Sequence, residues 1–129
     1  MPDTARVLES DKNCPSLALV EGDGRAHAVA WPGVGSRLRS MTRFWLGPNA
    51  ATVAQRHVME AVYYVIAGTG EVRDGDADTA QPLVQGSMAH VEPGTAYRFF
   101  AGAAGMELIG GPCPPDEALY RDLATPNRS

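Results

Sequence analysis

The sequence predicts an all-β domain of the sandwich or barrel type, and three observations carry this prediction. The chain has 129 residues, which suits one domain with a core of its own. Fourteen glycines and ten prolines fall at intervals along it. Between them lie short runs rich in β-branched and aromatic residues, a pattern typical of short strands joined by turns.

The first clear strand is expected at 41–46. Pro48 and Asn49 follow it and suit the two central positions of a type II turn, because proline fixes φ at the first and asparagine tolerates a positive φ at the second. A long extended segment is then expected at 55–66, ending at the glycine-rich residues 68–70.

The same alternation of strands and turns continues in the second half of the chain. Asp74-Gly75 is a hairpin signal, and a polar loop with Ala77, Asp78 and Thr79 follows it. Pro93-Gly94 is a second type II turn signal. The remaining expected strands are 71–73, 82–84, 86–91, 97–100 and 106–109.

The whole chain, residues 1–129, is expected to form a single domain. Its barrel core would span 41–110. The polar residues 1–16 are expected to form an N-terminal arm, either mobile or exchanged with a partner.

A short helix is expected at 115–124. Asp116 is a suitable N-cap residue, and Leu119 and Leu123 are spaced to lie on one face.

Composition excludes several classes of function. The net charge is −4, and ten arginines and a single lysine are scattered, so a nucleic-acid partner is not expected. No apolar run is long enough for a membrane span, and the N-terminus lacks a secretory signal, which favours the cytoplasm. Cys14 and Cys113 stand far apart with no C-x-x-C pair, so we expect reduced thiols and no structural zinc.

Two stretches resemble the paired motifs of the cupin superfamily, whose members are small double-stranded β-helix barrels. The first motif is a glycine, five residues, His-x-His, three or four residues, a glutamate, six residues and a glycine. The second is a glycine, five residues, Pro-x-Gly, two residues, a histidine, three residues and an asparagine. At matching spacing, the first frame here holds Asn49, Gln55, His57, Ala61 and Gly68, and the second holds Gly86, Glu92, Gly94, Tyr97 and Ala101.

This resemblance implies an all-β double-stranded β-helix, that is, a cupin or jelly-roll barrel with a short C-terminal helix. In members that bind metal, two histidines, a glutamate and a third histidine usually form the site. Those positions here hold Gln55, His57, Ala61 and Tyr97. An amide is a weak ligand, and a phenol with a pKa of about 10 binds metals well only when deprotonated. We therefore expect no obligatory metal; the alternative is Fe, Mn, Ni or Zn held by Gln55, His57 and Tyr97.

Strand alternation predicts which side chains line the barrel pocket, because successive residues point to opposite faces. His57 is the expected general base, and Tyr97 the expected proton donor or oxyanion partner. Each could instead be a packed core residue. The expected substrate-binding residues are Gln55, Met59, Tyr63 and Phe99, together with Arg43 if its strand turns it inward.

Two further ionisable residues are expected outside the pocket. By the same alternation Glu60 points away from His57, and His90 packs on the outer face of its strand.

The resemblance and this pocket together predict a small-molecule enzyme of a bacterial, possibly secondary-metabolic, pathway. The expected chemistry is that of an acid–base isomerase, cyclase, dehydratase or decarboxylase acting on a small organic substrate. One alternative is a metal-dependent dioxygenase or lyase with an atypical Gln/His/Tyr site. Another is a non-catalytic ligand-binding cupin.

A homodimer is also expected. The face opposite the pocket carries Val58, Val62, Tyr64 and Ile66. A strand that is apolar on both faces is covered on both, here by a second sheet or a partner subunit.

Overall fold

The computed structural model describes residues 5–75 and 79–124. Within them the chain forms short and long strands, two 3₁₀ turns and one turn of α-helix. The strands are β1 (Ser16–Leu17), β2 (Val20–Glu21), β3 (Gly24–Ala30), β4 (Met41–Leu46), β5 (Ala51–Thr52), β6 (Ala61–Asp74), β7 (Thr79–Leu83), β8 (Met88–Val91) and β9 (Tyr97–Pro112). The helical elements are η1 (Pro32–Val34), η2 (Glu117–Tyr120) and α1 (Arg121–Ala124).

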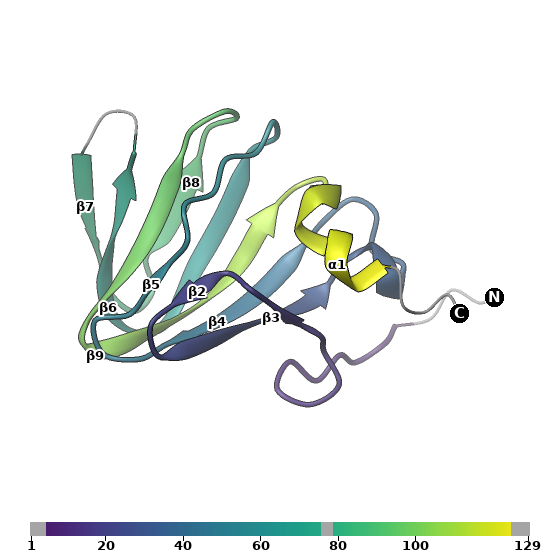
Figure 1. Cartoon of the computed structure of the whole chain (residues 1–129), viewed down its shortest axis with the longest axis horizontal. Coiled ribbons are helices and arrows are strands. Elements are labelled where there is room, and N and C mark those ends of the chain that lie inside the picture. Colours follow the sequence, from purple (N-terminus) through teal and green to yellow (C-terminus); the bar gives the residue numbers. More distant parts are fainter. Residues whose placement is uncertain (1–4, 76–78, 125–129) are drawn as a thin grey trace.

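These strands form one antiparallel sheet that curls on itself (Figure 1). One path through it runs β1-β3-β4-β9-β5-β2, and β6 pairs with β7, β8 and β9. The sheet therefore closes into a barrel, and the prediction of an all-β barrel with a short C-terminal helix is confirmed. Strands β1 to β3 were not expected, because they are short and interrupted by glycines.

The central ladder joins the two longest strands, β6 and β9. It runs from the pair Ala61 and Pro112 to the pair Asp74 and Tyr97, with register shifts on either side of Gly68. Such bulges bend a strand and let it pass from one side of a barrel to the other. The expected extended segment 55–66 is thus corrected at both ends: the strand begins at Ala61 and continues through the glycines to Asp74.

Both expected type II turns are present. Asn49 has φ of 61°, and the N–H of Ala50 donates to Gly47 O at 3.0 Å. Gly94 has φ of 82°, and the N–H of Thr95 donates to Glu92 O at 3.2 Å.

The hairpin signal at Asp74-Gly75 also falls where β6 turns back into β7. Asp74 pairs with Thr79, which opens β7 and was expected in the loop. The expected loop residues Ala77 and Asp78 lie outside the described residues.

Alternation along the strands builds the core. In β4, Thr42, Phe44 and Leu46 are buried, while Arg43 and Trp45 face outward. The largest fully buried side chains are aromatic or aliphatic: Tyr63, Tyr97, Phe44, Phe99, Met106, Leu108 and Val65. Burying each such side chain stabilises the fold by about 1.5–3 kcal/mol.

The described part of the expected N-terminal arm lies against its own barrel. The imidazole Nδ1–H of His27 donates to Ser10 O at 2.7 Å, and Arg43 donates to Ser10 Oγ at 3.1 Å. Residues 1–4 of the arm lie outside the described residues.

The C-terminal turn closes one end of the barrel (Figure 1). As expected, Asp116 caps it: the side chain accepts from the N–H of Ala118 at 3.1 Å. Tyr120 is buried and stacks on Trp31 with ring centroids 5.2 Å apart. Among the described residues, no helix is long and apolar enough to cross a membrane.

Candidate functional site

Four ionisable side chains form a continuous hydrogen-bonded chain inside the barrel. His57 Nδ1 lies 2.6 Å from Asp116 Oδ2, and His57 Nε2 lies 3.1 Å from the Tyr97 hydroxyl. The Tyr97 hydroxyl in turn lies 2.5 Å from that of Tyr63. Because these residues come from distant parts of the sequence, the fold alone brings them together.

Main-chain hydrogen bonds fix the two segments that carry the imidazole of His57 and the phenol of Tyr97. Gln55 and Tyr97 exchange two main-chain hydrogen bonds, of 3.0 and 2.9 Å. The main-chain O of His57 accepts from the N–H of Gly94 at 2.7 Å, so the second type II turn fixes the segment that carries His57. His57 is 5% exposed and Tyr97 2% exposed. Both side chains are thus almost completely shielded from solvent.

The direction of these hydrogen bonds follows from the chemistry of the carboxylate. An ionised carboxylate only accepts, so the Nδ1–H of His57 donates to Asp116. In the neutral imidazole, Nε2 then carries the lone pair and accepts from the Tyr97 hydroxyl. The oxygen of Tyr97 is left to accept from Tyr63. All the donors in the chain therefore point toward Asp116.

Both phenols keep their protons at neutral pH. Burial raises the pKa of Tyr97, the hydrogen bond from Tyr63 acts in the opposite direction, and the charge of Asp116 raises it again. Burial also raises the pKa of Tyr63 well above its usual range, and the nearby Tyr97 adds to this effect. Tyr97 is thus a phenol, not a phenolate, in the resting protein.

Gln55 contacts the imidazole and is itself 7% exposed. Its Oε1 lies 3.3 Å from His57 Nε2, and its Nε2 has no hydrogen-bond partner among the described residues. In the present orientation of the amide, Gln55 Oε1 can accept from the Nε2–H of an imidazolium. If the amide is turned by 180°, its N–H group faces the lone pair of neutral His57 instead. The Gln55 amide is therefore compatible with both protonation states of His57.

Tyr97 is the member of the hydrogen-bonded chain that also lines a cavity of about 470 Å³. The cavity walls come from β6, β7, β8 and the turn before β9. They consist of Val72, Asp74, Thr79, Gln81, Pro82, Leu83, Ser87, Met88, Ala89, His90, Val91, Glu92, Thr95 and Tyr97. Among these described residues there is no arginine or lysine. The cavity therefore has mixed polar and apolar walls, which carry carboxyl groups and an imidazole.

Arg43 does not enter this cavity, so its expected substrate-binding role is wrong. It lies on the outer face of β4 because its neighbours in the strand take the inward positions. There it pairs with Glu107 at 2.9 Å, and its guanidinium lies 4.7 Å from the ring centre of Trp45.

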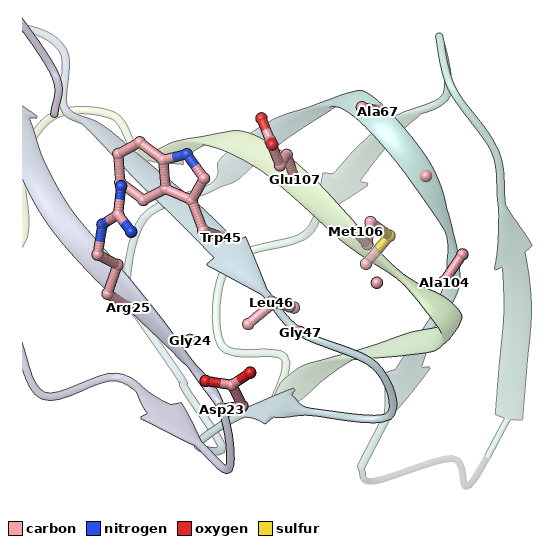
Figure 2. Close-up of a pocket in the computed structure, with 12 residues that line it drawn as sticks. Asp23, Gly24, Arg25, Trp45, Leu46, Gly47, Ala67, Ala104, Met106 and Glu107 are labelled. Atoms are coloured by element: carbon pink, nitrogen blue, oxygen red, sulfur yellow. The ribbon is translucent and has the colours of Figure 1, made fainter.

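A separate hollow of about 300 Å³ lies beside Trp45 (Figure 2). The guanidinium of Arg25 stacks 4.0 Å from the Trp45 ring centre, and Glu107 and Asp23 stand on its walls. Neither His57 nor Tyr97 lines this hollow, so the predicted catalytic residues lie elsewhere.

The other expected pocket residues divide into two groups. Tyr63 and Phe99 join the cluster, with ring centroids 4.8 Å apart, and Phe99 also packs against Tyr97. Met59 is half-buried in the segment before β6, and it is not among the described residues that line the cavity.

Glu60 and His90 lie on the outside of the barrel, as strand alternation predicts. Their side chains pair at 2.8 Å, and each is about half exposed. The hydrogen bond to Glu60 raises the pKa of His90; partial desolvation acts in the opposite direction.

The donor set of the interior does not fit a transition-metal ion. Its one imidazole is already engaged at Nδ1 by Asp116, its two phenols stay protonated, and its amide is neutral. Nowhere in residues 5–75 and 79–124 do three His, Cys, Asp or Glu side chains gather as metal ligands would.

Asp116 is the member of the site that sequence reasoning missed. In the sequence it is a helix cap beside two prolines, and it lies 59 residues after His57. Neither motif includes it. Only the packing of the C-terminal turn against the barrel could have indicated its second role.

Comparison with known proteins identifies the architecture. No family model and no curated protein sequence matches the chain. Among solved structures it is similar to KdgF from a Halomonas species, with a TM-score of 0.70, 15% identity and 89% and 98% of the two chains covered. It is also similar to a predicted oxalate decarboxylase from Thermotoga maritima, with a TM-score of 0.69, 16% identity and 84% and 99% covered.

A third solved structure with this likeness is the polyketide cyclase RemF from Streptomyces resistomycificus. The TM-score is 0.66, the identity 19%, and 88% of this chain and 83% of that chain are covered. At such identities the likeness concerns the fold. The chain has the cupin fold, the double-stranded β-helix that the motif spacing predicts.

Proposed function

We propose that the protein is a small-molecule enzyme that moves a proton next to a carbonyl group and needs no metal. The observation that carries this proposal is the hydrogen-bonded chain from Tyr97, at the cavity wall, through His57 to Asp116. An imidazole backed by a carboxylate is a suitable proton acceptor near neutral pH. Isomerisation, cyclisation and dehydration are reactions that can begin with this proton transfer.

In the proposed mechanism Tyr97 is the group that touches the substrate. Its oxygen takes a proton from the carbon beside the carbonyl while its own proton passes to His57 Nε2. The electron pair of the broken C–H bond moves onto the carbonyl oxygen and gives an enolate. The new imidazolium is stabilised by Asp116, and Tyr63 donates to the Tyr97 oxygen throughout. Because both transfers occur together, the step never requires the free phenolate that the raised pKa of Tyr97 disfavours.

The second half of the reaction returns the proton. His57 gives it back to Tyr97, which delivers it to a different atom of the enolate in an isomerisation, or to a leaving hydroxyl in a dehydration. Neither protons nor electrons are gained or lost overall. This balance requires no oxidant, reductant or co-reactant.

The charge of the cavity supports an uncharged substrate. Its described walls carry the carboxyl groups of Asp74 and Glu92 and the imidazole of His90, and no guanidinium or ammonium. The carboxyl groups would repel a carboxylate substrate, and the imidazole of His90 already pairs with Glu60 at 2.8 Å. The volume of about 470 Å³ lies within the usual range for a small organic ligand. A neutral carbonyl compound fits best.

The similar structures support the proposal only in a general way. RemF is described as a polyketide cyclase, and the protein from Thermotoga maritima as a predicted oxalate decarboxylase. The absence of arginine and lysine from the described cavity wall favours chemistry on a neutral carbonyl compound over chemistry on a small dicarboxylate.

Proton exchange with solvent tests the proposal without knowledge of the natural substrate. The protein is incubated in D₂O with 2-tetralone, which is neutral, or with phenylpyruvate, which is an anion, and loss of the α-proton signal is followed by NMR. We expect faster exchange of 2-tetralone than of phenylpyruvate. His57→Ala and Tyr97→Phe should each lower the catalysed rate by about 10²-fold or more.

His27→Ala is the matched control, because it removes an imidazole that contacts Ser10 and Trp45 and does not line the cavity. An unchanged rate in His57→Ala would show that the catalytic proposal is wrong. If 2-tetralone stabilises the protein against heat but exchanges no faster than in buffer, a non-catalytic binding role is favoured instead.

A further inference from the structure

We infer that Asp116 is a positioning residue that fixes the tautomer of His57, so that the C-terminal turn is a working part of the site. This inference deepens the function proposed above and rests on it, because the proposed proton relay, in which the Tyr97 proton passes to His57, needs the Nε2 lone pair. The contact itself is the 2.6 Å pair between His57 Nδ1 and Asp116 Oδ2. The side chain of His57 is 4% exposed, and that of Asp116 is 22% exposed.

The two oxygens of Asp116 have different tasks. Oδ1 accepts from the N–H of Ala118 at 3.1 Å and so builds the turn. Oδ2 accepts from His57. The main-chain O of Asp116 accepts from the N–H of Leu119 at 3.0 Å. The carboxylate is therefore held from its own segment and has little freedom to leave the imidazole.

The segment that carries Asp116 is fixed to the barrel on both sides. Before it, the N–H of Cys113 donates to Glu60 O at 3.0 Å. After it, the buried ring of Tyr120 stacks on Trp31. These contacts place Asp116 opposite the sequence-distant His57, and they explain how a short helical turn can act on a buried ring.

The tautomer decides whether the relay works. With the proton on Nδ1, neutral His57 offers Nε2 to the Tyr97 hydroxyl. With the proton on Nε2 instead, the ring would donate to the Tyr97 oxygen, and the Tyr97 proton would have no acceptor on His57. Only the first tautomer connects Tyr97 to the carboxylate.

Asp116→Asn separates this role from the structural one. Asparagine is as good an N-cap as aspartate, so its Oδ1 is expected to keep the bond from Ala118 and with it the turn. The amide NH₂ group then faces His57 Nδ1 and donates to it. The variant should therefore move the imidazole proton to Nε2. Asp122→Asn is the matched control, because it makes the same change at an exposed position of the same C-terminal segment.

The experiment is long-range ¹H–¹⁵N NMR of protein labelled at histidine nitrogens, at a pH where the ring is neutral. We expect a protonated Nδ1 in the native protein and in Asp122→Asn, and a protonated Nε2 in Asp116→Asn. A protonated Nε2 in the native protein would overturn the inference, even if the variant did not fold. So would an unchanged tautomer in folded Asp116→Asn.

The exchange assay with 2-tetralone separates this inference from the proposed function. If the tautomer reverses and kcat for exchange falls while KM stays unchanged, both stand. If the tautomer reverses and exchange is unaffected, the assignment of Asp116 stands and the proposed relay fails.

Discussion

At the scale of single residues, the proposed chemistry of the site depends on the phenol of Tyr97, which occupies a position where the cupin motif has histidine. The phenol receives a hydrogen bond from Tyr63 and gives one to His57. A neutral imidazole there would accept at one nitrogen and donate from the other, whereas the Tyr97 oxygen does both at a single atom. Tyrosine therefore joins His57 and Tyr63 through one oxygen.

Removing the central hydroxyl should cost more stability than removing the terminal one. Tyr97→Phe leaves the buried hydroxyl of Tyr63 without an acceptor and His57 Nε2 without its phenolic donor, and it is expected to destabilise by about 2–3 kcal/mol. Tyr63→Phe removes only one donor and should cost about 1 kcal/mol. Urea unfolding of the two variants measures the difference. Equal costs would contradict the order of donors.

The Glu60–His90 pair gives a pH-dependent test at the surface. The carboxylate favours the charged imidazole, so the pKa of His90 is raised in the folded chain. The stabilising interaction is therefore fully present below the unfolded pKa of histidine and is lost as the pH rises through the folded pKa. Glu60→Gln should lower the pKa of His90, as measured by NMR titration of its ring protons. Glu71→Gln, a change at a residue paired with Arg73, should leave it unchanged.

At the scale of elements, strand alternation predicted side-chain direction better than it predicted strand boundaries. Of the residues expected to face inward, Gln55, His57 and Tyr63 are buried and Met59 is half-buried, although regular pairing begins only at Ala61. The direction survives because Gln55 makes an isolated bridge to Tyr97 and Gly94 holds the main chain of His57. These contacts are long-range, so a local pattern could not indicate where the strand begins.

The close approach of β6 and β9 should depend on glycine at position 68. A Cβ there would lie 2.2 Å from Gly105 O, and φ is +84°. Gly86 has a similar φ of +92°, but a Cβ there meets nothing within 4 Å. We therefore expect Gly86→Ala to cost about 1 kcal/mol from the left-handed conformation alone. Gly68→Ala should cost at least about 2 kcal/mol more, because the backbones must separate.

Thermal or urea unfolding of both alanine variants tests this contrast. Similar losses would show that conformation, not the close approach of the two strands, sets the need for glycine at position 68.

At the scale of the whole molecule, motif spacing was enough to predict the fold, because it fixes where turns and inward positions occur around the barrel. It was not enough to predict the site. The phase of β4, and with it the direction of Arg43, depends on its pairing with β3 and β9. The contact between Asp116 and His57 depends on where the C-terminal turn docks. Both are properties of tertiary structure and leave no local pattern.

The outer face of the barrel supports the proposal of a homodimer. Tyr64 on β6 and Met88 on β8 are register partners, and they are 43% and 65% exposed. Val58, before β6, is 86% exposed. No segment within residues 5–75 and 79–124 covers these side chains, so the expected covering by a second sheet does not apply here. A second copy of the chain is the proposed cover.

Light scattering coupled to size-exclusion chromatography measures the oligomeric state. We expect a mass of two chains, each of 13.7 kDa. Tyr64→Glu should shift it to one chain by placing a charge in the apolar face. Leu38→Glu changes a residue that is 79% exposed elsewhere and should not. A single-chain mass for the native protein at micromolar concentration would contradict the proposal.

The distance of Asp116 from His57 along the chain also bears on biosynthesis. Fifty-nine residues separate them, and the strands that enclose the imidazole come before the carboxylate that orients it. A ribosome therefore releases His57 and Tyr63 well ahead of Asp116. Since β9 ends at Pro112, the last barrel strand and the carboxylate emerge almost together, and the orientation of His57 is settled only as the barrel closes.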